Sequence, residues 1–360
     1  MRNVHPTALQ DVWFSLIALL WAGYFLLEGF DFGVATLLPV VAHGDVERRV
    51  VINSVGPLWD GNEVWLLVAG GATFAAFPTW YATVFSAFYL PLFLVLAALI
   101  FRGVAFEFRH RDHRPEWKMW WDRALFWGSV VPAILWGVAF ADFVSGVPVN
   151  RAGGFVGNFW SLVHPYALFG GLTTFVLFAL HGAVFLSLKT SGPVAARARR
   201  LARRLGPLAA AVLFGFLTWT YLNARSLHDT GVVPGVVPVA AIAAVAVVGW
   251  LVEAQLDGWA FVATAIGIVL LVATFFMDLF PRVLVSSLNP AYSLTIPGTA
   301  SHPYTLKVMT IVAAVFTPFV LLYQGWTYWV FRRRLTVPVP VDGGRVTAGA
   351  PHSDGSVPTP

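Results

Sequence analysis

The stretch AAIAAVAVVGWLV (240–252) decides the fold class, because it is almost purely aliphatic and carries no charged side chain. It can only form a buried or lipid-facing helix. Similar runs recur along the 360 residues, of which 58% are hydrophobic and 11% are charged. A helix that crosses a bilayer needs roughly 20 mostly apolar residues. The composition therefore predicts an all-α integral membrane protein and excludes a set of soluble domains.

Nine segments are long and apolar enough to be predicted as transmembrane helices. They cover residues 12–38, 54–77, 81–104, 122–142, 163–187, 206–224, 235–254, 260–280 and 308–331. Two four-helix bundles plus one peripheral helix would account for nine. We expect residues 1–335 to form one polytopic membrane domain. The remainder, 336–360, is rich in Pro, Gly, Ser and Val, and we expect a disordered cytoplasmic tail there.

The basic residues indicate how the chain lies across the membrane. Of the 23 Lys and Arg residues, 18 fall in segments that a nine-helix topology places on the side of the C-terminus. Basic loops stay in the cytoplasm, so we expect a cytoplasmic C-terminus and an external N-terminus. The same rule explains the RARRLARR segment (197–204) as a cap that touches anionic lipid headgroups, and it makes a nucleic-acid partner unnecessary.

Few residues suit a metal or haem. The chain has no cysteine, which excludes iron–sulfur clusters, cysteine-ligated zinc and covalent c-type haem. His181 is the one histidine deep within a predicted span, whereas His164 and His302 lie near span ends. Met277 is the only candidate for a His/Met pair with His181, and a core histidine with satisfied hydrogen bonds is the favoured interpretation. We expect no cofactor on this chain.

Acidic residues inside apolar sequence are the first candidates for function. Glu28 and Asp31 lie in LLEGFDFGV (26–34), about 24 Å along a core of about 30 Å if the span begins at Val12. Ionisable groups at such positions face a partner, a cavity or a proton path. The pair could collect protons, or it could pair with Arg48 or Arg49. Gly29 and Gly33 form a small-xxx-small pattern that permits close approach of another helix.

A second acidic motif follows in GPLWDGNEVW (56–65). Asp60 comes after the Gly56-Pro57 pair, where we expect the backbone to turn or a helix to begin, and Glu63 lies one turn further on. Asp60 is either a structural cap at a broken helix or a buried acid that relays protons. Trp59 beside it is a structural candidate.

Three stretches resemble subunit II of the cytochrome bd quinol oxidases. They are EGFDFGV (28–34), ERRVVINSVGPLWDGNEVWLLVAGGATFAAFP (47–78) and FYLPLFLVLAALIFRGVAFEFR (88–109). Weaker matches continue through GVPVN (146–150), HGAVFLSLKT (181–190) and LTIPGTASHPYTLKVM (294–309). The resemblance covers almost the full length, and WDGNEVW with GFDFG is highly specific.

The resemblance implies a two-subunit core in the bacterial cell membrane. Its subunit I would bind two b-type haems, one d-type haem and the quinol, and would reduce dioxygen to water. Subunit II would bind no haem and would conduct cytoplasmic protons, with Asp60 as the family's path residue. Asp31 matches the family motif directly, whereas Glu28 stands where the family commonly has Asp. A small accessory subunit is a further possible partner.

The sequence thus favours the haem-free subunit of a terminal quinol oxidase that generates a membrane potential without pumping. Two alternatives stay open at this point. A proton-coupled secondary transporter would place Glu28, Asp31 and Asp60 at a substrate site, although transporter sites usually lie near the membrane midplane. A purely structural scaffold for subunit I would use the same acids only to pair helices.

Overall fold

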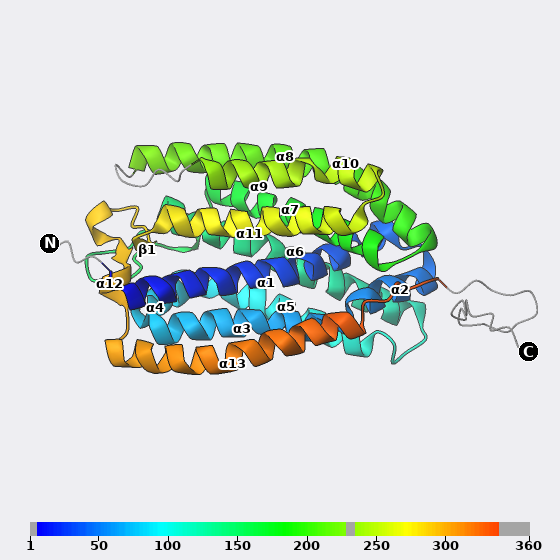
Figure 1. The fold of residues 1–360 in the computed structure, drawn as a ribbon, viewed down its shortest axis with the longest axis horizontal. Helices are drawn as coiled ribbons and strands as arrows, with labels where there is room; N and C mark the ends of the chain where they lie inside the picture. Colours follow the sequence, from blue (N-terminus) through cyan, green and yellow to red (C-terminus); the bar gives the residue numbers. More distant parts are fainter. Residues whose placement is uncertain (1–5, 228–234, 338–360) are drawn as a thin grey trace, which may run out of the picture.

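The computed structural model describes residues 6–227 and 235–337, and the predicted tail lies outside this range from residue 338 onward. Long helices run side by side in one elongated bundle (Figure 1). The helices are α1 (Ala8–Val41), α2 (Gly44–Val55), α3 (Trp59–Ala76), α4 (Pro78–Ala87), α5 (Tyr89–Phe108), α6 (Pro115–Ser145), α7 (Pro165–Lys189), α8 (Gly192–Leu227), α9 (Val236–Ala246), α10 (Val248–Glu253), α11 (Asp257–Leu279), α12 (Ile296–Thr299) and α13 (Pro303–Val330). Two short strands, β1 (Arg282–Leu284) and β2 (Leu294–Thr295), pair antiparallel at one end of the bundle.

Eight helices within the described residues are long and apolar enough to cross a membrane, and they correspond to eight of the nine predicted spans. The remaining predicted span, 54–77, contains α3. This helix has 18 residues and begins only at Trp59, after the turn at Gly56-Pro57. Its length of about 27 Å is close to a bilayer core of about 30 Å. It lies between α1 and α13 in Figure 1.

Two predicted boundaries are wrong for identifiable reasons. The predicted span 81–104 is divided into α4 and α5 at Phe88. Pro91 causes this break. It has no N–H to donate to the carbonyl of Ala87, four positions earlier, and its ring clashes with that carbonyl. Residues 192–205, predicted as part of a connection, form the beginning of α8. The RARRLARR segment is therefore helical rather than a loop.

The helices form two groups, which meet mainly where α7 packs on both α6 and α1. In the first group, α1 packs on α3 and α6, and α5 packs on α6. In the second, α7 packs on α8 and α11, while α9 and α10 pack against both α8 and α11. The last helix, α13, contacts α1 and α3 from outside, and Leu306 is its one buried residue. This arrangement matches two bundles with one peripheral helix.

Glycine at the α1–α7 contact permits the backbones of these two helices to approach closely. A methyl group added at Gly33 would lie 1.9 Å from the carbonyl oxygen of Phe178, and one at Gly182 would lie 2.4 Å from the carbonyl carbon of Gly33. At Gly29 it would lie 2.7 Å from the Phe178 ring. Backbone atoms cannot yield as a flexible side chain can, so α1 and α7 depend on glycine at positions 33 and 182.

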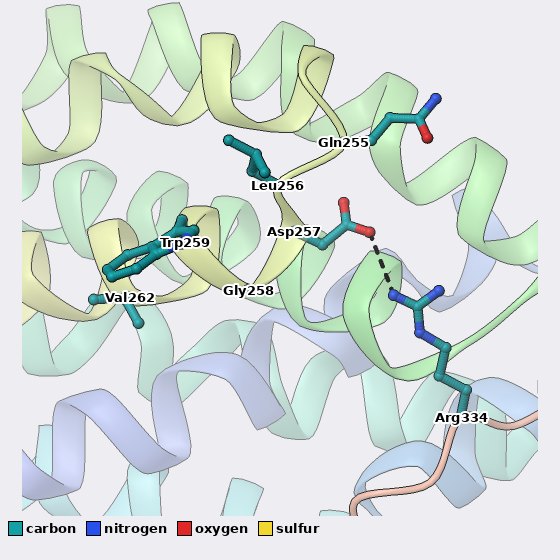
Figure 2. Close-up of a pocket in the computed structure, with 7 residues that line it drawn as sticks. All are labelled: Gln255, Leu256, Asp257, Gly258, Trp259, Val262 and Arg334. Carbon is teal, nitrogen blue, oxygen red and sulfur yellow. Dashed lines mark ion pairs between the residues drawn. The ribbon is translucent and has the colours of Figure 1, made fainter.

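One end of the bundle, on the right in Figure 1, gathers most of the basic residues, and we call it the arginine-rich end. The segment after α13 is attached here, because Leu335 N donates to Lys189 O at 2.8 Å and Leu335 O accepts from Ser191 N at 3.0 Å. Arg334 Nη2 then lies 3.7 Å from Asp257 Oδ2 (Figure 2). The described chain begins at the opposite end of the bundle (Figure 1).

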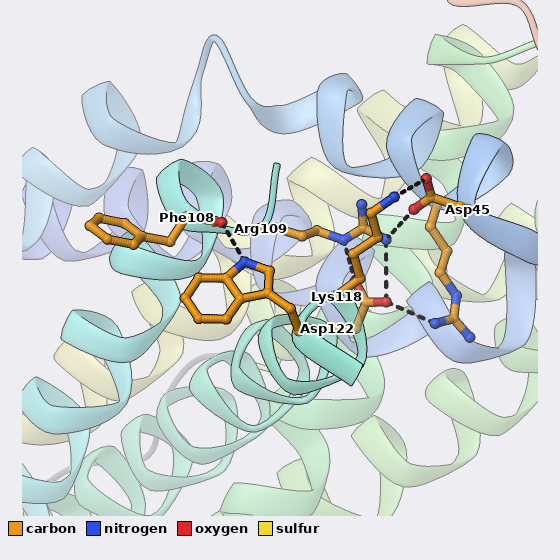
Figure 3. Close-up of polar contacts among 7 residues, drawn as sticks. Asp45, Phe108, Arg109, Lys118 and Asp122 are labelled. Carbon is orange, nitrogen blue, oxygen red and sulfur yellow. Dashed lines mark hydrogen bonds and ion pairs between the residues drawn. The ribbon is translucent and has the colours of Figure 1, made fainter. Parts of the chain in front are cut away.

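Ion pairs fix α2 at the arginine-rich end (Figure 3). Arg109 Nε donates to Asp122 Oδ1 at 2.5 Å, and its Nη2 donates to Asp45 Oδ1 at 3.0 Å. Lys118 Nζ lies 2.8 Å from Asp45 Oδ2, and Arg48 Nη1 lies 2.7 Å from Asp122 Oδ2. These contacts join α2 to the end of α5 and the beginning of α6. They set the position from which α3 enters the bundle.

The acids of α2 have lowered pKa values. Burial alone would raise the pKa of Asp45, but the hydrogen bonds from Lys118 and Arg109 outweigh it and lower that pKa below its ordinary value. The hydrogen bond from Arg197 lowers the pKa of Glu47. A carboxyl group whose pKa is lower in the folded state stabilises the fold above its unfolded pKa, and this contribution disappears as the pH falls through the folded value.

We predict that Gly33→Ala prevents the protein from reaching its normal yield or thermal stability in detergent, because the new methyl group meets backbone. Gly249→Ala is the matched control, since its methyl group would meet only Pro207 Cδ at 3.9 Å. The measurement is the melting temperature of purified protein together with the monodisperse yield. Equal behaviour of the two variants would contradict the close-packing argument.

We predict that the double variant Asp45→Asn with Glu47→Gln lowers the melting temperature by about 2–4 °C at neutral pH. The difference from the parent protein should persist down to about pH 4, near the unfolded carboxyl pKa values, and should shrink below it. Melting curves in detergent across pH 3 to 7 provide the test. A difference that stays constant over this range would show that ionisation of these acids does not stabilise the fold.

Candidate functional site

The centre of the candidate site is a buried group of charges that we call the Arg102 cluster. It consists of Glu28 and Asp31 on α1, Glu63 on α3 and Arg102 on α5. Arg102 Nη1 lies 2.7 Å from Glu28 Oε2 and 3.5 Å from Glu63 Oε2, and its Nη2 lies 3.9 Å from Asp31 Oδ2. The side chains of Glu28, Asp31 and Arg102 have no solvent exposure, whereas that of Glu63 is 25% exposed. Two helices, α1 and α3, thus bring three carboxyl groups to the one guanidinium on α5.

Arg102 is the site residue that the sequence did not identify. It lies six residues before the end of α5, directly after the apolar run LVLAALIF and within the predicted span 81–104. The sequence signal was available, because an arginine in an apolar span must have a partner. Its guanidinium also lies 4.8 Å from the centre of the Phe32 ring, which is a cation–π contact. Phe32 comes from the same EGFDFGV stretch as the acids.

The expected partners of the acidic pair were wrong. Arg48 pairs with Asp122 at the arginine-rich end, and Arg49 is exposed. Both acids instead lie near the guanidinium of Arg102. With every group ionised, three carboxylates would face one guanidinium. Burying that excess negative charge in low dielectric is costly unless one of the carboxyl groups is protonated.

Asn62 connects the cluster to α13. Its Nδ2 donates to Asp31 Oδ2 at 2.7 Å. Its Oδ1 accepts from Tyr328 Oη at 2.8 Å and from Gln324 Nε2 at 3.1 Å. These bonds form a continuous polar connection from α1 through α3 to α13 in otherwise apolar surroundings. Asn62 belongs to the WDGN motif, but the sequence analysis did not predict that it connects the cluster to α13.

Asp60 is exposed on the surface of this chain, which contradicts the alternative in which it is a buried acid. The reason is helical geometry, since Asp60 and the buried Asn62 are two residues apart and thus about 200° apart around α3. Glu63, one helical turn further along α3, lies 3.5 Å from Arg102. Trp59 next to Asp60 stacks on Phe106 with ring centres 5.0 Å apart, which joins α3 to α5.

The histidines lie apart from the Arg102 cluster. His181 is fully buried on α7, its Nδ1 lies 2.6 Å from Thr264 Oγ1, and its ring stacks on Phe261 at 4.6 Å. His164 Nε2 lies 2.8 Å from Asp142 Oδ1 near the opposite end of the bundle, and His302 caps α13. Within residues 6–227 and 235–337, no three His, Cys, Asp or Glu side chains are grouped so that they could hold a metal ion.

Comparison with known proteins gives one consistent result. The sequence profile of the family "Cytochrome bd terminal oxidase subunit II" matches residues 9–331. Cytochrome bd ubiquinol oxidase subunit 2 of Bacillus subtilis is 39% identical over 334 residues, which cover 93% of this chain and 99% of that protein. Cytochrome bd-I ubiquinol oxidase subunit 2 of Escherichia coli K12 is 34% identical over 362 residues, with 91% and 95% covered.

A solved structure shows the same fold. The bd oxidase from Geobacillus thermodenitrificans contains a chain that superposes with a TM-score of 0.71 at 19% identity. The superposition covers 90% of this chain and 97% of that one.

We predict that Arg102→Gln destabilises the protein by about 3–5 kcal/mol, because it leaves carboxyl groups buried without a cation. Adding Glu28→Gln should restore part of the loss, since the double variant buries one carboxylate fewer. The two substitutions should be coupled by about 0.5–3 kcal/mol in a double-mutant cycle measured by thermal unfolding in detergent. Strictly additive losses would show that the ion pair of Arg102 and Glu28 carries no coupling energy.

Proposed function

Because the chain belongs to the cytochrome bd terminal oxidase subunit II family, a component of quinol oxidase complexes in membranes, we propose that it conducts protons to a haem-bearing subunit I. The complex would oxidise quinol, reduce dioxygen to water and generate a membrane potential without pumping. Subunit I would hold two b-type haems and one d-type haem, and this chain would hold none. The family assignment decides against the secondary-transporter alternative.

The observation that carries the proposal is the Arg102 cluster. A proton carrier inside a membrane must bind a proton without burying unbalanced charge. Three carboxyl groups around one guanidinium meet this requirement, because one carboxyl can be protonated while Arg102 balances another. Asp31 then connects through Asn62 to Tyr328 by hydrogen bonds of 2.7 and 2.8 Å. The partly exposed Glu63 is the member through which protons would reach the buried pair.

The arginine-rich end would face the cytoplasm. Glu28 and Asp31 lie in the second half of α1, the half that leads toward this end. A proton from the cytoplasm would therefore reach Glu63 and the pair through a short depth of the membrane. This orientation gives the proton path the direction that consumes cytoplasmic protons when water is formed.

Subunit I would cover the outer face of α3 and α13. Asp60 is an exposed acid on a helix that lies among membrane-spanning helices, and lipid cannot solvate a carboxylate. Further along α3, a methyl group added at Gly70 or Gly71 would meet no atom within 4 Å. Small residues of this kind allow another helix to approach closely. A partner on this face would enclose Asp60 beside Glu63 and extend the path into subunit I.

We predict that the double variant Glu28→Gln with Asp31→Asn slows oxygen reduction by a factor of about 10–100, since amides cannot exchange protons as carboxyl groups do. Oxygen consumption per haem in the purified complex is the measurement, with the haem spectrum as the assembly control. Glu28→Asp is the matched control because it keeps a carboxyl group, and it should retain most of the activity. Full turnover of the double amide variant would leave only the scaffold role.

The variant Asp60→Asn distinguishes a role of Asp60 in proton entry from a role in assembly of the complex. We expect a complex with its full haem content that consumes oxygen slowly and builds its potential slowly. Unchanged turnover would exclude an essential relay role for Asp60. Loss of all haem would show that Asp60 is needed to assemble the two subunits instead.

We predict for the topology that reporter fusions after Arg204 and after Arg334 both report the cytoplasm, because both sites lie at the arginine-rich end. A fusion after Ser287, at the opposite end beside β1, should report the outside. Alkaline phosphatase and green fluorescent protein fusions in intact cells distinguish the two sides. An external signal after Arg204 or Arg334 would overturn the orientation.

A further inference from the structure

A cavity of about 410 Å³ opens at the arginine-rich end, away from the Arg102 cluster (Figure 2). Its walls are the turn between α10 and α11 (255–258), Trp259 and Val262 on α11, and Arg334 after α13. Gln255 at the turn has a positive φ of 59°, which is uncommon outside glycine. The cavity lies where the last segment of the chain returns to the bundle.

The cavity carries surplus positive charge. Asp257 is 3% exposed, and Arg199 neutralises it with two contacts, Nε to Oδ1 at 3.1 Å and Nη2 to Oδ2 at 2.5 Å. Ser187 Oγ also donates to Asp257 Oδ1 at 3.3 Å. Arg334 Nη2 stays 3.7 Å away, beyond hydrogen-bond distance, and its side chain is 51% exposed. The guanidinium of Arg334 can therefore bind an anion without leaving Asp257 unpaired.

Arg334 is held in place by its backbone rather than by its side chain. Leu335, the next residue, exchanges hydrogen bonds with Lys189 and Ser191 at the α7–α8 turn. The guanidinium is thus presented to the cavity from a fixed point. This arrangement favours a phosphate over a small halide, because phosphate oxygens can accept two parallel N–H bonds from arginine.

An apolar groove adjoins this cavity. Val262 lines both spaces, and the groove of about 380 Å³ runs between α1, α11 and α13. Its walls include Leu27, Phe30, Ile266 and Tyr328. At the junction, Trp259 is 65% exposed, and tryptophan is enriched at the boundary between headgroups and acyl chains. The combined shape is a charged cavity followed by an apolar groove.

From the surplus charge of Arg334 and the groove that begins at Val262, we propose that this site binds one anionic phospholipid. The phosphate would contact Arg334, and one acyl chain would follow α11 past Ile266 toward Tyr328. The lipid would fill the space between α11 and α13. Since Leu306 is the one buried residue of α13 in the described structure, such a lipid would strengthen the attachment of the helix that holds Asn62 through Tyr328.

The test uses the full complex purified from membranes, stripped with detergent and incubated with phosphatidylglycerol or phosphatidylcholine. Native mass spectrometry counts the lipids that remain bound. The parent protein should retain one phosphatidylglycerol at least about fivefold better than phosphatidylcholine, a factor that one arginine near a lipid headgroup supplies. Arg334→Gln should abolish the preference. Arg333→Gln removes an exposed charge one residue away and should keep it.

A second pair of variants tests the role of the apolar groove. Ala265→Phe fills the groove and should reduce retention of both lipids, whereas Ala243→Phe makes the same change on the exposed face of α9 and should not. Equal retention by parent and Arg334→Gln would overturn the proposal. A second result would also overturn it: inorganic phosphate alone stabilises the protein through Arg334, and Ala265→Phe does not change lipid retention. The cavity would then bind free phosphate. Loss in Arg333→Gln as well would reduce the site to general surface charge.

Discussion

The ion pair between Arg102 and Glu28, with Nη1 and Oε2 2.7 Å apart and neither side chain exposed, constrains much of the bundle. A guanidinium within a membrane helix requires carboxylates, and carboxylates within a membrane helix require a cation. Each group is therefore tolerable only when α1 and α5 are in register. Asp31 and Glu63 add a second and third acid, so the charge balance also fixes α3. Burial of these groups costs free energy that a purely structural contact would avoid, which favours a role that needs protons to bind and leave.

The packing of α1 explains how this cluster stays buried. On one side α1 meets α7 through Gly33 and Gly182, where no methyl group fits. On the other side it presents Glu28 and Asp31 to Arg102 and Asn62. The EGFDFG stretch (28–33) thus has two functional faces. Its glycines form a close helix contact, and its acids belong to the polar cluster. Both constraints act on the same short stretch, which explains why glycines and acids occur together in this motif.

The sequence predicted the fold class and eight of the helices that can cross a membrane, because long apolar runs report burial in lipid directly. It missed the break at Phe88 and the early start of α8 at Gly192, which depend on the clash at Pro91 and on packing that hydropathy does not measure. In the site it found Glu28, Asp31 and Glu63. It missed Arg102, which was counted only among the basic residues that indicate topology. It left open whether Asp60 is buried, because hydropathy gives no direction around a helix.

Exposed Asp60 and buried Arg102 together indicate which face of this chain a partner subunit would cover. A lone carboxylate on the outer face of α3 is unfavourable in lipid, whereas the cluster behind it has its own cation. Glu63, one helical turn from Asp60 on α3, is 25% exposed and lies 3.5 Å from Arg102. Under the proposed function, the face that exposes Asp60 would also be the face through which the cluster exchanges protons. Covering it with a partner would at once remove the exposed charge from lipid and give the cluster an outlet, so assembly and proton transfer would depend on the same surface.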